Sequence, residues 1–142
     1  MRQPSLLNRS RSAAPKFALG VALLLSSVGV ALADSTFPFG HELLLDARPM
    51  KGSKRVPILD IRANGAAEID LWCNSVQGQI VVASDTITIT TGEKTERQCE
   101  PERMRRDDEM LSTLSQVTNW RRQGDTLILS GPRTIRFRLE TN

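Results

Sequence analysis

The chain has 142 residues, of which 39% are hydrophobic, 25% are charged and only 4% are aromatic, so its length allows one domain with a modest core. Four of its 19 basic residues and none of its 16 acidic ones precede residue 34, so residues 34–142 hold 15 basic and 16 acidic side chains, a net charge of −1. That balance excludes the broad positive surface of a nucleic-acid-binding protein. One histidine and two cysteines are too few for a typical zinc site, and we expect no metal or other cofactor.

The first 33 residues have the pattern of a signal peptide. A basic segment precedes the apolar residues 17–30, and Ala31-Leu32-Ala33 fits the small-residue pattern that a signal peptidase cleaves. An uncleaved membrane anchor is the alternative, but the apolar run of about 17 residues is at the lower limit for crossing a bilayer. The residue directly after Ala33 is Asp34 and not a cysteine, so a lipoprotein is excluded. We therefore predict a signal peptide over residues 1–33 and one domain over residues 34–142, a soluble monomer in a bacterial periplasm or secreted.

The predicted domain is mainly β-structure. Apolar and polar residues alternate in several short segments, and turn residues such as Asn64-Gly65 and Gly124-Asp125 separate them. Such alternation is typical of strands that bury one face. The predicted strands are residues 42–45, 57–61, 67–71, 79–83, 86–90, 117–122, 126–129 and 134–139. Since the last two connections are short, we expect the last three strands to be antiparallel neighbours.

One segment, residues 101–116, predicts an amphipathic helix that begins with a proline. Its apolar face is formed by Met104, Met110, Leu111, Leu114 and Val117. The charged side chains Arg103, Arg105, Arg106, Asp107, Asp108 and Glu109 are predicted to form a solvated face with local ion pairs, the alternative being a patch for a partner. Residues 48–55 predict an exposed, mobile loop.

Cys73 and Cys99 predict a structural disulfide. They form an even number in an exported chain and lack the C-x-x-C spacing of a redox site. A thiol redox site is the alternative, but no neighbouring residue would lower a thiol pKa. Closing this loop would stabilise the fold by about 3–4 kcal/mol.

Three short motifs around these cysteines resemble those of the META domain, the family of the bacterial heat-shock protein HslJ. Cys73-Asn74 followed by Gly78 is similar to its C-N-x-x-x-G element, and residues 95–99 are similar to its T-x-x-x-C element. Its acid-x-x-aromatic-Leu-x-x-Leu helix is matched by Asp107, Met110, Leu111 and Leu114. The resemblance spans residues 65–139. It implies an α+β fold, mainly β, in which an antiparallel half-barrel-like sheet of about seven to eight strands packs on one amphipathic helix. It also implies an envelope protein with a link to stress response.

No catalytic constellation is recognisable, and we expect that the chain is not an enzyme. His41 is the only histidine, so a Ser-His-Asp triad would depend on a residue near the start of the mature chain. Trp72 and Trp120 are interpreted as core residues, with exposed binding anchors as the alternative.

A candidate binding face lies on the last three strands, where arginines gather. Alternation sets Arg136 and Arg138 on the opposite side of their strand from Phe137. Such guanidinium groups could meet anionic lipid, peptidoglycan carboxylates or an acidic protein, although charge that only prevents edge-strand aggregation is an equally good explanation. The members of the candidate face are Arg121, Arg122, Arg133, Arg136 and Arg138.

Two functional hypotheses remain. The first is an exported META-domain module that maintains the envelope by binding an envelope component or periplasmic protein. The second is a small secreted enzyme inhibitor, similar to the β-domain inhibitors of lysozyme, although their tyrosine-bearing loop has no counterpart in a chain without tyrosine.

The predicted cleavage site is directly testable. If the signal peptide is removed after Ala33, the protein purified from the envelope begins at Asp34. Intact-mass measurement or N-terminal sequencing checks this, and retention of residues 17–33 would contradict it.

Overall fold

Eight antiparallel strands and one helix make up residues 36–140, the part of the chain that this computed structural model describes. The predicted signal peptide and the predicted boundary at residue 34 lie outside these residues. The elements are β1 (His41–Leu45), β2 (Ile58–Ile61), β3 (Ala66–Asp70), β4 (Ser75–Ala83), β5 (Thr86–Lys94), α1 (Pro101–Ser115), β6 (Asn119–Gln123), β7 (Thr126–Ser130) and β8 (Thr134–Leu139).

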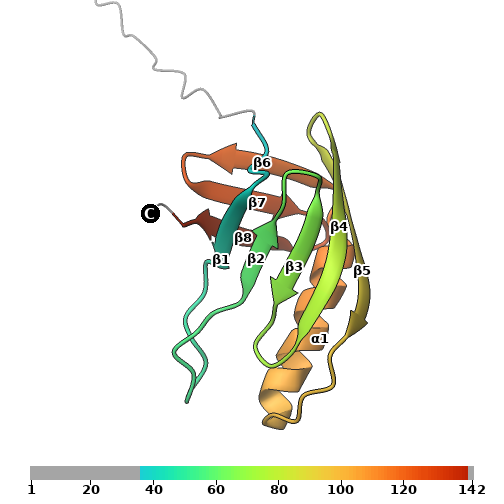
Figure 1. Cartoon of the computed structure of the whole chain (residues 1–142). Coiled ribbons are helices and arrows are strands. Elements are labelled where there is room, and N and C mark those ends of the chain that lie inside the picture. Colours follow the sequence, from blue (N-terminus) through green and yellow to red (C-terminus); the bar gives the residue numbers. More distant parts are fainter. Residues whose placement is uncertain (1–35, 141–142) are drawn as a thin grey trace, which may run out of the picture. The chain divides into compact units, whose positions relative to one another are not determined.

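The strands form a closed barrel in which each pairs with its neighbours in sequence and β8 returns to β1 (Figure 1). This confirms the expected fold class, mainly β with one helix, and closure goes further than the half-barrel that the resemblance implied. The pairing between β5 and β6 is the shortest in the barrel. These strands share a single residue pair in register, Thr86 with Asn119, so they separate beyond it.

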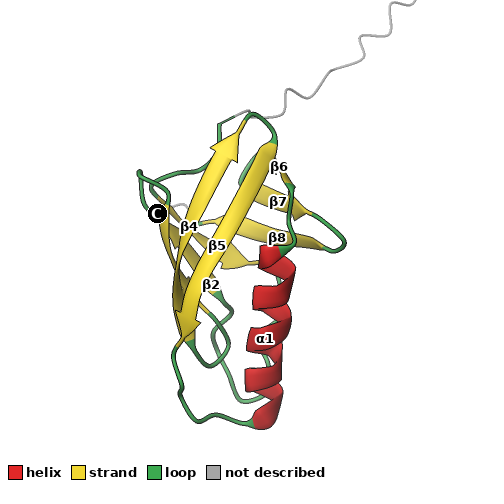
Figure 2. Cartoon of the chain, turned by 90° about the vertical axis from the view of Figure 1, so that its right-hand side faces the viewer, coloured by secondary structure: helices red, strands yellow, loops and turns green. Residues whose placement is uncertain are grey.

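The helix α1 fills the space that this separation leaves. It runs beside β5 and below the sheet of β6 to β8 (Figure 2). Met110 and Leu114 belong to the same buried cluster as the inward side chains of the strands. The predicted amphipathic helix is therefore confirmed, and its apolar face completes the barrel wall.

A continuous row of apolar side chains crosses the barrel interior. Register pairs align Leu43 with Leu139 on one side and with Leu59 on the other, and the row continues through Ile69 to Val76. All five are at most 9% exposed. Alternation in each strand thus places one side chain in two at the core, as the sequence pattern predicts.

Three strand boundaries differ from the prediction by two residues or more, and one of them is the end of β5, which lies at Lys94 rather than at residue 90. β4 begins at Ser75, four residues before the predicted start, because Ser75, Val76 and Gln77 continue the ladder with β3. β6 begins at Asn119 rather than residue 117, because the Val117 backbone N–H still bonds the Leu114 carbonyl at the end of the helix. The start of β4 was missed because its first residue, Ser75, is polar. The start of β6 was placed too early because the residue that follows the helix end, Val117, is apolar.

Trp120 is a core residue and Trp72 is half-buried. Trp120 is 8% exposed, and its ring makes a T-shaped contact with Phe37 at a centroid distance of 5.1 Å. Its indole N–H donates to the Ser84 carbonyl at 2.9 Å. Trp72 instead lines two surface hollows. Only Trp120 thus fits the core interpretation fully.

Alanine substitutions at two glycines test how closely the start of β3 approaches β4. Gly65 and Gly40 both have positive φ, +81° and +78°, but a side chain at Gly65 would meet the Ile80 carbonyl whereas one at Gly40 would meet nothing. Gly40→Ala should cost about 1 kcal/mol through backbone strain alone. Gly65→Ala should cost about 3 kcal/mol because overpacking is added. Urea denaturation measures the loss of unfolding free energy in both variants. Equal losses would show that the backbone at Gly65 and Ile80 moves apart without cost.

Candidate functional site

The five arginines of the candidate face do not share one surface. Arg121 and Arg136 lie on the outer face of the sheet, each in register with Ile128 from the neighbouring strands. Arg138 is on the same side of β8 as Arg136, because Phe137 between them is fully buried. Arg122 alternates to the other side of β6 from Arg121, and Arg133 lies in the turn before β8.

The outer arginines also have a packing role. Ile128 lies between the buried Leu127 and Leu129 in β7, so its side chain points outward, yet it is only 2% exposed. Because Arg121 and Arg136 are its cross-strand neighbours, their aliphatic stems are the groups placed to cover it. The guanidinium groups then lie beyond an apolar patch, at the surface, since both arginines are exposed.

Two of the arginines have partners. The Arg138 Nε lies 3.4 Å from an Asp46 carboxylate oxygen, and the Arg122 Nε donates to the Gly124 carbonyl at 2.8 Å. Arg133 borders two adjoining hollows along α1, of about 420 and 240 Å³. The face is therefore a row of Arg121, Arg136 and Arg138, with Arg133 near one end.

An acidic row lies on other strands of the barrel. Glu42, Asp60 and Glu68 are aligned in register across β1, β2 and β3. Loss of water contact raises the pKa of the Glu42 carboxyl above its usual range, and the hydrogen bond to Glu140 and its charge raise it further. The barrel thus has a negative side on β1 to β3 and a positive side on β6 to β8.

Other chemical features are few among residues 36–140. His41 is exposed at the start of β1. No group of three or more histidine, cysteine, aspartate or glutamate side chains in the described part of the chain is arranged to hold a metal ion. No helix within these residues is long and apolar enough to cross a membrane.

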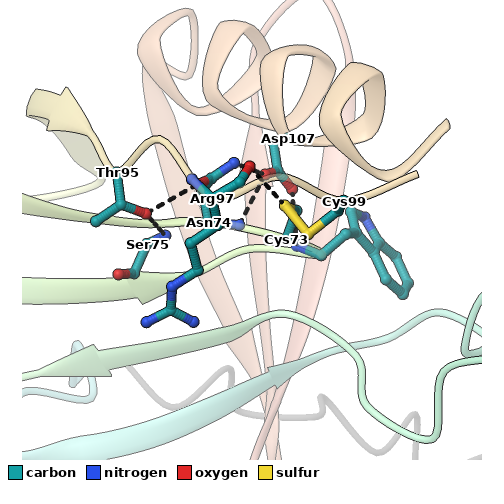
Figure 3. Close-up of a disulfide and its surroundings, with 8 residues drawn as sticks. Cys73, Asn74, Ser75, Thr95, Arg97, Cys99 and Asp107 are labelled. Carbon is teal, nitrogen blue, oxygen red and sulfur yellow. Dashed lines mark hydrogen bonds between the residues drawn. A yellow bond between two sulfur atoms is a disulfide. The ribbon is translucent and has the colours of Figure 1, made fainter. Parts of the chain in front are cut away.

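A buried carboxylate beneath the helix organises the segment between β3 and β4. Asp107 on α1 is fully buried, and one of its oxygens accepts the backbone N–H groups of Trp72 at 2.8 Å and Cys73 at 3.1 Å. Its other oxygen accepts the backbone N–H of Asn74 at 2.9 Å and the side-chain amide of Asn74 at 3.1 Å. Figure 3 shows this carboxylate pointing from the helix into the Cys73-Asn74 turn. We call this set of hydrogen bonds the Asp107 clamp.

The buried Asn74 extends the clamp to the segment that follows β5. Its side-chain oxygen accepts the Arg97 backbone N–H at 2.7 Å and the Thr95 hydroxyl at 3.0 Å, and the Thr95 oxygen in turn accepts the Ser75 N–H at 3.0 Å. The disulfide between Cys73 and Cys99 joins the same two segments, with Cα atoms 6.1 Å apart (Figure 3). The expected disulfide is thus present, and hydrogen bonds surround it.

The prediction of a solvated charged face on α1 is wrong for Asp107. Its carboxylate is turned into the protein because residues 107, 110 and 114 follow helical spacing on one face, so Asp107 shares the face of Met110 and Leu114. Arg103 is half-buried and is also not part of a solvated face. Local ion pairs do form among the other members, linking Arg105 and Arg106 to Glu102 and Glu109, and Asp108 pairs with Lys94.

Sequence reasoning placed Asp107 in the family motif but missed what it does. The signal was its position at the acid of the acid-x-x-aromatic-Leu-x-x-Leu helix, because the Cys73-Asn74 motif supplies its partners and the third motif bonds to Cys73 and Asn74 in turn. Cys73-Asn74 provides the N–H groups, and Thr95 and Cys99 come from the T-x-x-x-C element. Three motifs far apart in sequence therefore meet in one structural unit.

Comparisons with known proteins agree with this convergence. The family model described as META domain matches residues 41–141. A solved structure titled "NMR structure of the protein" is similar in fold, with a TM-score of 0.55 and 15% identity over 70% of this chain and 89% of that chain. None of the curated proteins compared with the chain matches it.

Neighbouring aspartates on α1 provide a matched test of the clamp. Asp107→Asn keeps the size of the side chain but places an amide group where buried N–H donors need an acceptor. It should lower the free energy of unfolding by about 2–4 kcal/mol. Asp108→Asn, at an exposed side chain paired with Lys94, should cost less than about 1 kcal/mol. Urea denaturation with the disulfide intact measures both, and similar costs for the two variants would contradict the clamp.

Proposed function

The chain belongs to the META domain family, and we propose that it acts in the bacterial cell envelope as an exported, non-enzymatic module that maintains the envelope by binding an anionic partner. Export is supported by the signal-peptide pattern of residues 1–33 and by the disulfide, a bond typical of oxidising compartments. The partner is an envelope component or a periplasmic protein.

The observation that carries the proposal is the outer row of Arg121, Arg136 and Arg138. Three guanidinium groups on β6 and β8, the two strands that flank β7, can form paired hydrogen bonds with carboxylates or phosphates. The acidic row of β1 to β3 repels the same partner, so the partner's orientation on the barrel is set by charge. Contacts of this kind raise the rate of encounter and weaken with salt.

Exchange of two arginines tests the proposed face. Arg136→Gln with Arg138→Gln should reduce co-sedimentation of the protein with purified envelope fragments by about tenfold at low salt, because two charge-assisted contacts are lost. The matched control is Arg48→Gln with Arg62→Gln, which removes the same charge from exposed positions elsewhere.

Folding must be checked in the same experiment, because Arg136 is placed to cover Ile128. A thermal melt of each variant does this, and Arg136→Lys with Arg138→Lys keeps the aliphatic stems and the charge. Equal binding by the glutamine variant and the wild type at low salt, with both folded, would contradict the proposal.

The enzyme-inhibitor hypothesis needs its own measurement. Strong inhibition of lysozyme by the purified protein would favour it over the envelope module.

A further inference from the structure

A polar hollow of about 410 Å³ lies beside the disulfide, on a different part of the barrel from the outer arginine row. Its walls come from the loop before β2, the end of β3, the Asp107-clamped turn, the segment after β5, and α1. Three arginines, one aspartate and one tryptophan are among its lining residues, namely Arg55, Arg97, Arg103, Asp70 and Trp72. The formal charge of the lining is therefore positive.

Arg55 and Arg97 are exposed and Arg103 is half-buried, and within the described residues no side chain or backbone group pairs with their guanidinium groups. The Arg103 Nε is buried from solvent and has no hydrogen-bond partner. Such an unpaired buried donor is costly and rare in native proteins.

Each arginine is nevertheless held in place through its backbone. The Arg97 N–H is bonded to Asn74, and Cys99 fixes the chain two residues further on. Arg103 belongs to the first turn of α1, and a Cβ added at Gly52, in the loop before β2, would lie 3.5 Å from its Nη2. Arg55 is fixed by Ser53, whose hydroxyl oxygen accepts the Arg55 N–H at 3.2 Å and donates to the Arg55 carbonyl at 3.1 Å.

This arrangement has the chemistry of an oxyanion site. Guanidinium groups bind carboxylate and phosphate through pairs of N–H donors, and hydrogen bonds already hold the backbone at Arg55 and Arg97. Three positive charges around one hollow, with Asp70 as the one acidic lining residue, repel one another, and a dianion reduces that repulsion. A half-buried indole, Trp72, adds an apolar wall against which the body of a small organic anion can lie.

We propose that the hollow lined by Arg55, Arg97 and Arg103 is a binding site for a small ligand that carries phosphate or carboxylate groups. The site does not involve the outer arginine row, so it stands or falls independently of the proposed function. Both ligand chemistries present the same oxygens to the arginines, and the experiment separates them.

Nuclear magnetic resonance of the arginine side chains tests the site. The purified protein is titrated with inorganic phosphate, with citrate, and with sodium chloride of matched ionic strength, and the Nε–H signals are followed. Phosphate or citrate at millimolar concentration should shift the Arg103 signal with a saturating curve, and the tighter of the two identifies the ligand chemistry. Chloride should not reproduce the shift.

Variants show whether the three arginines act together. Arg103→Gln and Arg55→Gln should each weaken anion binding about tenfold, because each removes a charge-assisted contact. Arg62→Gln, an exposed arginine outside the hollow, is the matched control and should change nothing. Since Arg55 lies in an exposed loop, its variant tests the site even if Arg103→Gln is unstable. In Arg103→Gln, the Trp72 fluorescence change on binding replaces the lost Nε–H signal.

Two results would overturn the proposal. In the first, neither phosphate nor citrate shifts the Arg103 signal more than chloride does. In the second, Arg62→Gln weakens binding as much as Arg55→Gln, which would mean that the anions respond to overall charge rather than to the hollow.

Discussion

The carboxylate of Asp107 is the group on which the local structure of this barrel depends. A buried charge is unfavourable unless hydrogen bonds replace its water, and here three backbone N–H groups and one amide do so. Those donors in turn need an acceptor, because the Cys73-Asn74 turn is buried and leaves the β3–β4 ladder. The helix and the turn therefore satisfy one another's buried polar groups.

The disulfide and the clamp hold the same segments by different means. The covalent bond limits how far residues 73 and 99 can separate, whereas the hydrogen bonds of Asn74 set the orientation of the chain between Thr95 and Arg97. Because β5 and β6 share one pair in register, α1 must close the barrel wall, and the clamp is what ties α1 to the β3–β4 end. The clamp also positions the arginine hollow, because Arg97 lies in the segment bonded to Asn74 and Arg103 lies on α1.

The sheet could be predicted because alternation of apolar and polar residues is a local property. Each strand around Leu43, Ile69 or Phe137 shows its buried face in its own sequence, and short connections define its neighbours. Closure between β8 and β1 could not be predicted this way, because it depends on pairing between the two ends of the domain. Asp107 stands in a run of charged residues that resembles a solvent face, and only its helical spacing from Met110 and Leu114 indicates burial. The hollow of Arg55, Arg97 and Arg103 was beyond sequence reasoning, since its members are distant in the chain.

The arginines of the last strands show why a composition argument identifies a surface only in part. The five arginines are close in sequence, but alternation places Arg122 on the other side of β6 from Arg121, and Arg138 is paired with Asp46. Arg121 and Arg136 flank an outward apolar residue, so one side chain serves packing and charge together.

Amide hydrogen exchange at Trp72, Cys73 and Asn74 tests the central claim most directly. If the Asp107 carboxylate holds this turn, these N–H groups are protected in the wild type and exchange much faster in Asp107→Asn, while amides of the β7–β8 ladder keep their relative protection. Rapid exchange of the three amides in the wild type, or equal protection in both proteins, would contradict the account.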